Sequence, residues 1–220
     1  MILAFDTCTL RGTIAVGTVD HLLAESNFKT EKGHTGWLMP RVDSMLGSLG
    51  MKPAELDAVA VGTGPGNFTG VKVGVATAKA VAMGLDVPLV GISTLDVLAA
   101  GVVEPAGAIL SVIDARRGML YAAAYRNDPG ALRLLSDYMC AGQVEITGAV
   151  LPLVKGSVVI AGEAPPELTE AFKAEGVTVT EDAGRFPCAR DMLALCDMML
   201  STGRAGTAVS VTPIYLKKPT

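Results

Sequence analysis

The sequence has few of the residues that build metal and redox centres. Its two histidines, His21 and His34, fall on different predicted elements, whereas a zinc protease needs two histidines at i and i+4 and a third ligand. The four cysteines are scattered, with no Cys-x-x-Cys spacing, which favours reduced thiols. We therefore predict no metal site in this chain.

Basic charge and nucleophile motifs are also scarce. The net charge is −4 and the sequence pI is about 5.2, and Arg116-Arg117 is a pair rather than part of a basic run. Proteins that bind nucleic acid through its phosphates need a basic face, so any action on RNA would depend on a partner's surface. No Gly-x-Ser-x-Gly motif occurs, and no Ser or Cys triad can be assembled. We predict no catalytic residue.

Apolar residues, by contrast, make up 50% of the chain, and the mean hydropathy is +0.44. Residues 71–92 are the best candidate for a membrane span, which needs about 20 mostly apolar residues. Four residues interrupt this stretch, namely Lys72, Lys79, Asp86 and Pro88. We reject the span and attribute the apolar excess to a surface made for a partner. The first residues lack the features of a signal peptide, so we expect a cytoplasmic protein.

The apolar pattern predicts three strands and then a helix at the start of the chain, and again three strands at the start of a second half. That order opens the half-domain of actin-like ATPases, although other α/β folds share it. We predict two half-domains, residues 1–104 and 105–220. The predicted strands are 2–6, 12–18, 21–29, 58–61, 89–92, 108–113, 119–126, 132–139, 158–161 and 177–180. The predicted helices are 35–49, 68–84, 94–100, 165–175 and 190–200.

A glycine-rich segment between an apolar strand and a helix is the most specific feature. It reads Gly64-Pro65-Gly66-Asn67-Phe68-Thr69-Gly70-Val71-Lys72-Val73-Gly74. The segment lacks the Lys-Ser/Thr ending of a P-loop and the spacing of a dinucleotide fingerprint. Its glycines permit a close approach by another chain or a ligand, and Asn67 or Thr69 can cap the helix, whose free N–H groups could hold an anion. A plain strand-to-helix turn is the alternative.

This segment resembles the GPGSFTGLRIG signature of the bacterial TsaB family, also called YeaZ. Other segments resemble the family in the same order along the chain, namely residues 1–9, 34–40, 114–118 with Tyr121, and 213–216. Three residues depart from the family motifs, with Cys8 and Asn67 in place of serine and Lys72 in place of arginine. The resemblance therefore runs from residue 1 to residue 216.

The resemblance implies an α/β fold of the actin-like ATPase class (ASKHA, ribonuclease H-like), a duplicated fold of two small mixed-sheet half-domains with flanking helices. It implies a noncatalytic adaptor for TsaD, which transfers a threonylcarbamoyl group to adenosine 37 of tRNAs that read ANN codons. TsaC-type enzymes would make the threonylcarbamoyl-AMP donor, and the ATPase TsaE would cycle the complex. The alternative is an ATP-dependent kinase or ATPase of the same fold.

The same resemblance implies that the first two helices dock on TsaD in a four-helix interface. Small residues stand four apart on the second helix, at Gly70, Gly74, Ala78 and Ala82. Such a row lets another helix approach closely. Trp37 is either a core residue or an interface anchor. The predicted partner interface consists of His34, Trp37, Leu38, Arg41, Val42, Met45, Val71, Gly74, Val75 and Ala78.

Asp6 and Asp114 each follow the first strand of a half, where an actin-like ATPase places phosphate or metal carboxylates. Asp6 and Thr7 could instead satisfy N–H groups of their own turn. After Asp114, Arg116 and Arg117 stand where phosphates would need glycines. We therefore predict only a vestigial nucleotide site at Asp6, Thr7 and Asp114.

The expected cofactors and partners follow from the same resemblance. The chain itself should need no cofactor, and ATP or ADP with Mg²⁺ would act only in the complex. TsaD is the direct partner, whereas TsaE and tRNA are reached through the complex. We expect no membrane partner and a homodimer when TsaD is absent.

Overall fold

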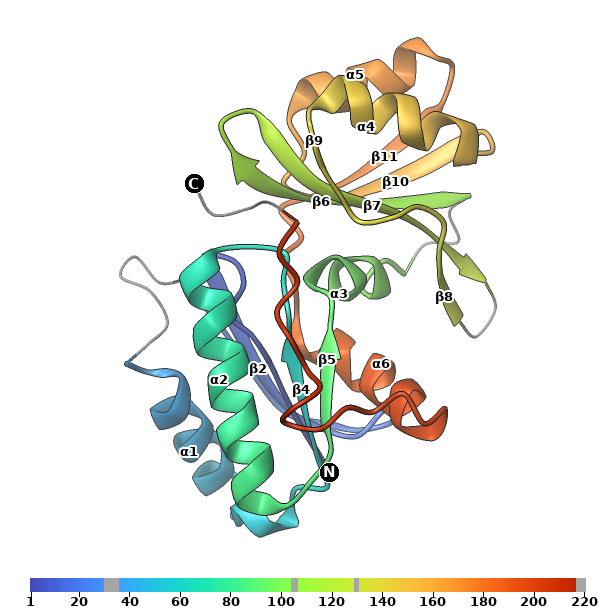
Figure 1. Ribbon diagram of the computed structural model, residues 1–220. Coiled ribbons are helices and arrows are strands. Elements are labelled where there is room, and N and C mark those ends of the chain that lie inside the picture. Colours follow the sequence, from blue (N-terminus) through green and yellow to red (C-terminus); the bar gives the residue numbers. More distant parts are fainter. Residues whose placement is uncertain (30–35, 104–106, 129–130, 217–220) are drawn as a thin grey trace. The chain divides into compact units, whose positions relative to one another are not determined.

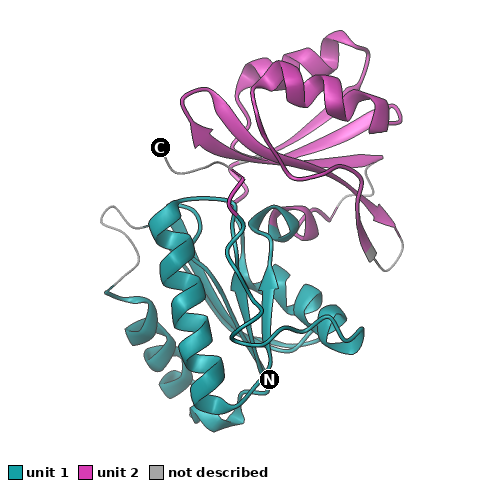
Figure 2. Cartoon of the chain, viewed as in Figure 1, with its two compact units in different colours: residues 1–97, 187–214 teal, residues 98–186, 215–220 magenta. Residues whose placement is uncertain are grey.

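The computed structural model describes residues 1–29, 36–103, 107–128 and 131–216. Contacts divide the chain into two compact units, residues 1–97 with 187–214 and residues 98–186 with 215–220 (Figure 2). The predicted boundary at Glu104 lies outside the described residues. The division between units instead falls at residues 97 and 98, and the first unit includes a C-terminal segment that the prediction assigned to the second half.

The first unit is built on a five-stranded mixed sheet in the order β3-β2-β1-β4-β5. Its strands are β1 (Ile2–Asp6), β2 (Arg11–Gly17), β3 (Leu22–Lys29), β4 (Ala58–Gly62) and β5 (Leu89–Ile92). β1, β2 and β3 pair antiparallel, whereas β1, β4 and β5 pair parallel. The five strands agree with the predicted ones to within one residue at each end.

Helices cover both faces of this sheet (Figure 1). They are α1 (Leu38–Ser48), α2 (Phe68–Leu85) and α6 (Ala189–Ser201). The chain also forms a short 3-10 helix, η1 (Pro53–Glu55), and the helix α3 (Thr94–Ala100). The division between the two units falls within α3. Alternate residues of β1 point to opposite faces, so Leu3 and Phe5 pack with α1 and α2 in one core cluster. α6 contacts β1, β2 and β5.

The start of α6 explains why the C-terminal segment belongs to the first unit. Cys188, at the N-cap position, makes no side-chain capping hydrogen bond. Instead the hydroxyl of Thr13, on β2, accepts a hydrogen bond of 2.8 Å from the N–H of Ala189 and donates one of 2.6 Å to the amide oxygen of Asn27. Because Thr13 and Ala189 are both fully buried, water cannot replace this contact.

Replacing Thr13 with valine should lower the free energy of unfolding by about 1–3 kcal/mol. Valine has a similar shape, but it leaves the buried N–H of Ala189 without an acceptor. Urea denaturation followed by circular dichroism measures the change. Thr13→Ser keeps the hydroxyl and should restore most of the loss, and a valine variant as stable as wild type would contradict the capping role.

The second unit is a six-stranded sheet with helices on one face. Its strands are β6 (Ala108–Arg116), β7 (Met119–Asp128), β8 (Ala131–Leu134), β9 (Met139–Ala141), β10 (Ser157–Gly162) and β11 (Thr178–Ala183). The order is β11-β10-β6-β7-β8, with β9 also on β7. Its helices are α4 (Gln143–Val150), the short η2 (Leu151–Leu153) and α5 (Pro166–Ala174). Leu110 and Val112 of β6 pack with Ile146 and Phe172 in its core.

The two sheets repeat one topology. In each, an antiparallel meander is extended by two parallel strands, so that β6, β7, β10 and β11 correspond to β1, β2, β4 and β5. The predicted duplication is therefore confirmed. Two details differ, since the predicted strand 132–139 is two short strands, β8 and β9, and α4 was not predicted. Both short strands pair with β7, over different parts of its length.

Among the described helices, α2 alone is long and apolar enough to span a membrane by length and composition. One of its faces, however, is part of the core of the first unit. An amphipathic core helix passes the same test of length and hydropathy. This feature is therefore weak support for a membrane span.

Candidate functional site

The glycine-rich segment packs tightly around the turn that follows β1. A Cβ atom at Gly66 would overlap the carbonyl oxygen of Cys8, and one at Gly62 would overlap the carboxylate of Asp6. Gly64 has a φ of 97°, and a Cβ atom there would lie 3.0 Å from the carbonyl oxygen of Ile214. These close approaches give the glycines a packing role within the first unit.

Asn67 caps α2, as one of the two predicted alternatives. Its side-chain oxygen accepts a hydrogen bond of 3.0 Å from the N–H of Gly70, and its own N–H donates one of 2.6 Å to the carbonyl of Cys8. Thr69 lies inside the helix and is exposed. The strand-to-helix turn is thus fastened to the turn after β1.

Asp6 serves that turn directly. Its side chain is buried, with 1% of the residue exposed. One carboxylate oxygen accepts a hydrogen bond of 2.6 Å from the N–H of Cys8, and the other accepts one of 2.9 Å from the hydroxyl of Thr94. The hydroxyl of Thr7 donates to the carbonyl of Gly70 at 2.7 Å. Asp6 therefore satisfies an N–H group of its own turn, as the sequence left open, whereas Thr7 joins that turn to α2 instead.

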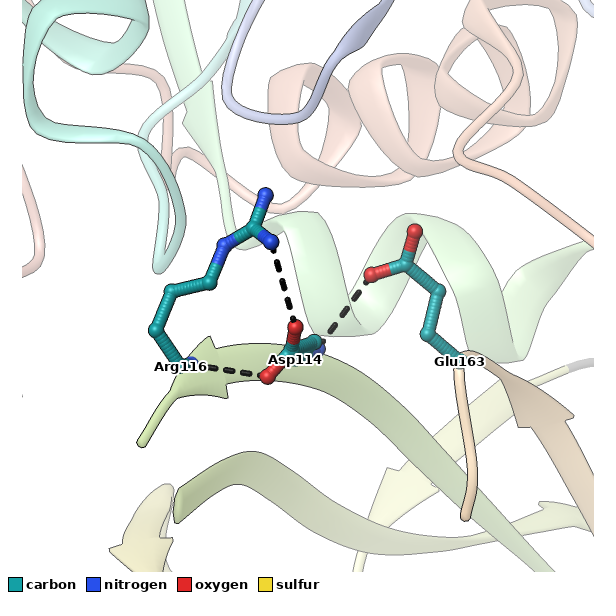
Figure 3. Close-up of polar contacts among 3 residues, drawn as sticks. All are labelled: Asp114, Arg116 and Glu163. Atoms are coloured by element: carbon teal, nitrogen blue, oxygen red, sulfur yellow. Dashed lines mark hydrogen bonds and ion pairs between the residues drawn. The ribbon is translucent and has the colours of Figure 1, made fainter. Parts of the chain in front are cut away.

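Asp114, in the second unit, has a different environment. It is exposed, and its N–H donates to a carboxylate oxygen of Glu163 at 3.3 Å (Figure 3). Its own carboxylate accepts the N–H of Arg116 at 2.7 Å and lies 3.7 Å from the guanidinium of that residue. Arg116 and Arg117 both have positive φ angles, of 68° and 57°. The turn therefore places two bulky side chains beside Asp114.

The structure corrects most of the predicted partner interface. Gly74 lies so close to the turn after β1 that a Cβ atom there would overlap the hydroxyl of Thr7. Ala78 is fully buried in the same core. The small-residue row thus faces the protein's own sheet, not a partner. Seven of the predicted residues are buried in this way, namely Leu38, Val42, Met45, Val71, Gly74, Val75 and Ala78.

The remaining predicted residues lie on or near the surface. Trp37 is half-buried against Phe28 of β3, Arg41 is exposed, and His34 lies outside the described residues. Trp37 therefore packs on the protein while keeping some exposure, and its role as an interface anchor stays a prediction.

The structure exposes a different apolar face on α2, which we call the outward face. It consists of Val73, Ala76, Thr77, Ala80 and Met83, which follow helical spacing opposite the buried row. Met83 is 71% exposed, and Ala76 and Ala80 are exposed as well. The sequence analysis did not identify this face, although its helical spacing is visible in the sequence. A helix with two apolar stripes does not reveal from its sequence which stripe is buried.

The environments of the cysteines predict an order of chemical reactivity. Burial raises the pKa of the Cys8 thiol well above its ordinary value, with a contribution from the charge of Asp6. Burial and the charge of Asp197 raise the pKa of Cys196 to about 12. Burial likewise raises the pKa of Cys188. Cys140 is only half-buried.

We expect iodoacetamide at pH 8 to modify Cys140 first in the folded protein and to leave the other three cysteines intact. The thiolate is the reactive form, and raised pKa values together with burial suppress it at those positions. Peptide mass spectrometry after timed labelling measures the order. All four cysteines should react in urea, and labelling of Cys8 as fast as Cys140 in the folded state would contradict the expectation.

Comparison with known proteins places these features in a family. Residues 24–149 match the family model described as TsaD, tRNA N6-adenosine threonylcarbamoyltransferase. The chain is 30% identical to the tRNA threonylcarbamoyladenosine biosynthesis protein TsaB of Escherichia coli (strain K12), over 98% of this chain and 94% of that protein. The chain belongs to the TsaB family. The TsaB protein of Bacillus subtilis (strain 168) is 39% identical over 60% of this chain and 57% of that protein.

Solved structures agree with this assignment. YeaZ from Pseudomonas aeruginosa has a TM-score of 0.82 at 26% identity and covers 98% of this chain and 99% of its own. The ROK hexokinase from Thermus thermophilus has a TM-score of 0.52 at 12% identity over 88% of this chain, a likeness of fold alone. The duplicated topology and these neighbours confirm the predicted actin-like fold for this member of the TsaB family.

Proposed function

We propose that the chain is a noncatalytic subunit that binds a TsaD-type transferase and supports threonylcarbamoyl transfer to adenosine 37 of tRNA. Its relatives in Escherichia coli and Bacillus subtilis are named for tRNA threonylcarbamoyladenosine biosynthesis, which supports the pathway. The match of residues 24–149 to the TsaD family model supports a partner of similar architecture.

The outward face of α2 is the observation that carries the binding role. No charged side chain belongs to this face, and alanines at positions 76 and 80 leave room for a helix to approach closely. An amphipathic helix normally turns such a stripe inward, but here the inward stripe is already used in the core. Exposed apolar surface of this kind is typical of a protein interface.

The turns at Asp6 and Asp114 support the noncatalytic role. A relative that uses a nucleotide would need both of these turns. Both carboxylate oxygens of Asp6 accept hydrogen bonds from the chain itself. The turn after Asp114 carries Arg116 and Arg117 in left-handed conformations where glycines would admit phosphates. A kinase or ATPase would need both turns open to its substrate.

Four further parts of the proposal rest on the family resemblance. TsaE and tRNA are reached through the complex. ATP or ADP with Mg²⁺ acts only in that complex. The complex works in the cytoplasm. Without TsaD, the outward face pairs with a second copy of the chain, because an apolar face made for a partner of similar fold can be covered by itself.

The test is the binding of TsaD from the same organism by wild type and by Ala80→Arg. Arginine there would place an unpaired charge in the interface, so we expect Ala80→Arg to bind at least about tenfold more weakly, which corresponds to about 1.4 kcal/mol. Calorimetry measures the affinity, sedimentation measures self-association, and a reconstituted tRNA modification assay measures function. The melting temperature should be close to that of wild type, since Ala80 is exposed.

Ala174→Arg is the matched control, because Ala174 is an exposed alanine on α5 of the second unit. It should bind TsaD normally. Wild type that fails to bind TsaD would overturn the proposal, and sustained ATP turnover that Asp6→Asn abolishes without unfolding would favour the kinase or ATPase instead.

A further inference from the structure

A stacked guanidinium stands at the N-terminal end of α1. The guanidinium carbon of Arg41 lies 4.7 Å from the ring centre of Phe28 and 5.3 Å from that of Trp37. The two rings meet edge to face, with centres 3.8 Å apart and planes at 83°. Phe28 is on β3 and Trp37 is the N-cap residue of α1, so three residues from two elements form this cluster.

Arg41 has no acidic partner among the residues that the structure describes. None of the ion pairs formed between described residues includes Arg41, although the residue is exposed. Its position also does not favour the helix, because a cation in the first turns of a helix opposes the helix dipole. Neither the helix dipole nor an ion pair with a described residue explains why a cation is placed here.

Stacking prepares the side chain for one kind of contact. A free arginine loses side-chain entropy when a contact fixes it, and the two rings already restrict Arg41. The rings hold the guanidinium at its contact side, and because Arg41 is exposed, its other N–H groups can still donate hydrogen bonds to a partner. A carboxylate matches the fork of N–H groups on an arginine with two parallel hydrogen bonds.

We propose that Arg41 is a specificity-determining residue that binds a carboxylate on the TsaD-type partner. The inference rests on the proposed function, because α1 lies beside α2 and shares its core, so a partner on the outward face comes next to α1 (Figure 1). The apolar face of α2 supplies contact area, and Arg41 selects a partner with an acidic residue in register.

The test measures TsaD binding by Arg41→Met, Arg41→Lys and Arg41→Glu at several salt concentrations. Arg41→Met keeps an apolar stem against the two rings but removes the charge, so it should keep the wild-type melting temperature and bind at least about tenfold more weakly. Its affinity should also depend less on salt than that of wild type. Arg41→Lys should be intermediate, because it keeps the charge without the fork geometry, and Arg41→Glu should be the weakest.

Lys29→Met is the matched control, since Lys29 is an exposed cation next to Phe28 in β3 and points to the opposite face of the sheet. It should bind as wild type does. The inference is overturned if Arg41→Met binds within about twofold of wild type, keeps the wild-type salt dependence, or loses binding only in proportion to a fall in melting temperature. In each of these cases wild type still binds TsaD, whereas failure of wild type to bind overturns the proposed function itself.

Discussion

Ala78→Arg is expected to unfold the first unit under conditions in which wild type is folded. Ala78 is fully buried, in a core cluster that includes Val61 and Val75. An arginine there would bury an unpaired charge, which costs several kcal/mol even after the structure relaxes. That is a large part of the 5–15 kcal/mol or so that stabilises a typical domain. Thermal and urea denaturation followed by circular dichroism measure the loss.

Ala80→Arg is the control for this experiment, because it introduces the same residue two positions later on an exposed part of α2. It should melt close to wild type. If Ala78→Arg instead melted within a few degrees of wild type, the small-residue row would not be packed on the sheet, and the original prediction of a partner surface there would regain support.

Gly66→Ala is expected to lower the free energy of unfolding by about 3 kcal/mol, the upper part of the range for overpacking. Gly66 does not have a positive φ, so alanine fits the local backbone conformation. The cost arises because the new Cβ atom would overlap the backbone carbonyl oxygen of Cys8, which cannot move as a side chain could. The contact also includes the hydrogen bond from Asn67 to that carbonyl. Urea denaturation measures the change.

Gly47→Ala supplies the comparison. Gly47 lies in α1, and no atom stands within 4 Å of a Cβ built there. Alanine should therefore be neutral or stabilise by up to about 1 kcal/mol through helix propensity. A Gly66→Ala variant as stable as Gly47→Ala would mean that the glycine-rich segment is open, and an anion site at the start of α2 would then merit a test.

Apolar periodicity predicted most of the strands and helices, because burial on a sheet or helix face imposes a spacing of two or of three to four residues. It missed α4, whose eight residues include Gly148 and give a weak pattern. It also merged β8 and β9, because a strand that ends and resumes beside the same neighbour looks continuous in sequence. Trp37 and Phe28 could not be linked, since their contact joins two elements.

The sequence by itself determined the order of elements, the duplicated fold and the resemblance to the TsaB family, because these depend on local spacing and on motifs. Only the tertiary structure decided which stripe of α2 is buried, how Asp6 is used, and that α6 belongs with the first unit. Each of those depends on contacts between distant residues, such as Thr13 with Ala189 or Gly74 with Thr7. A small-residue row fits closely against any neighbour, and its sequence does not identify that neighbour.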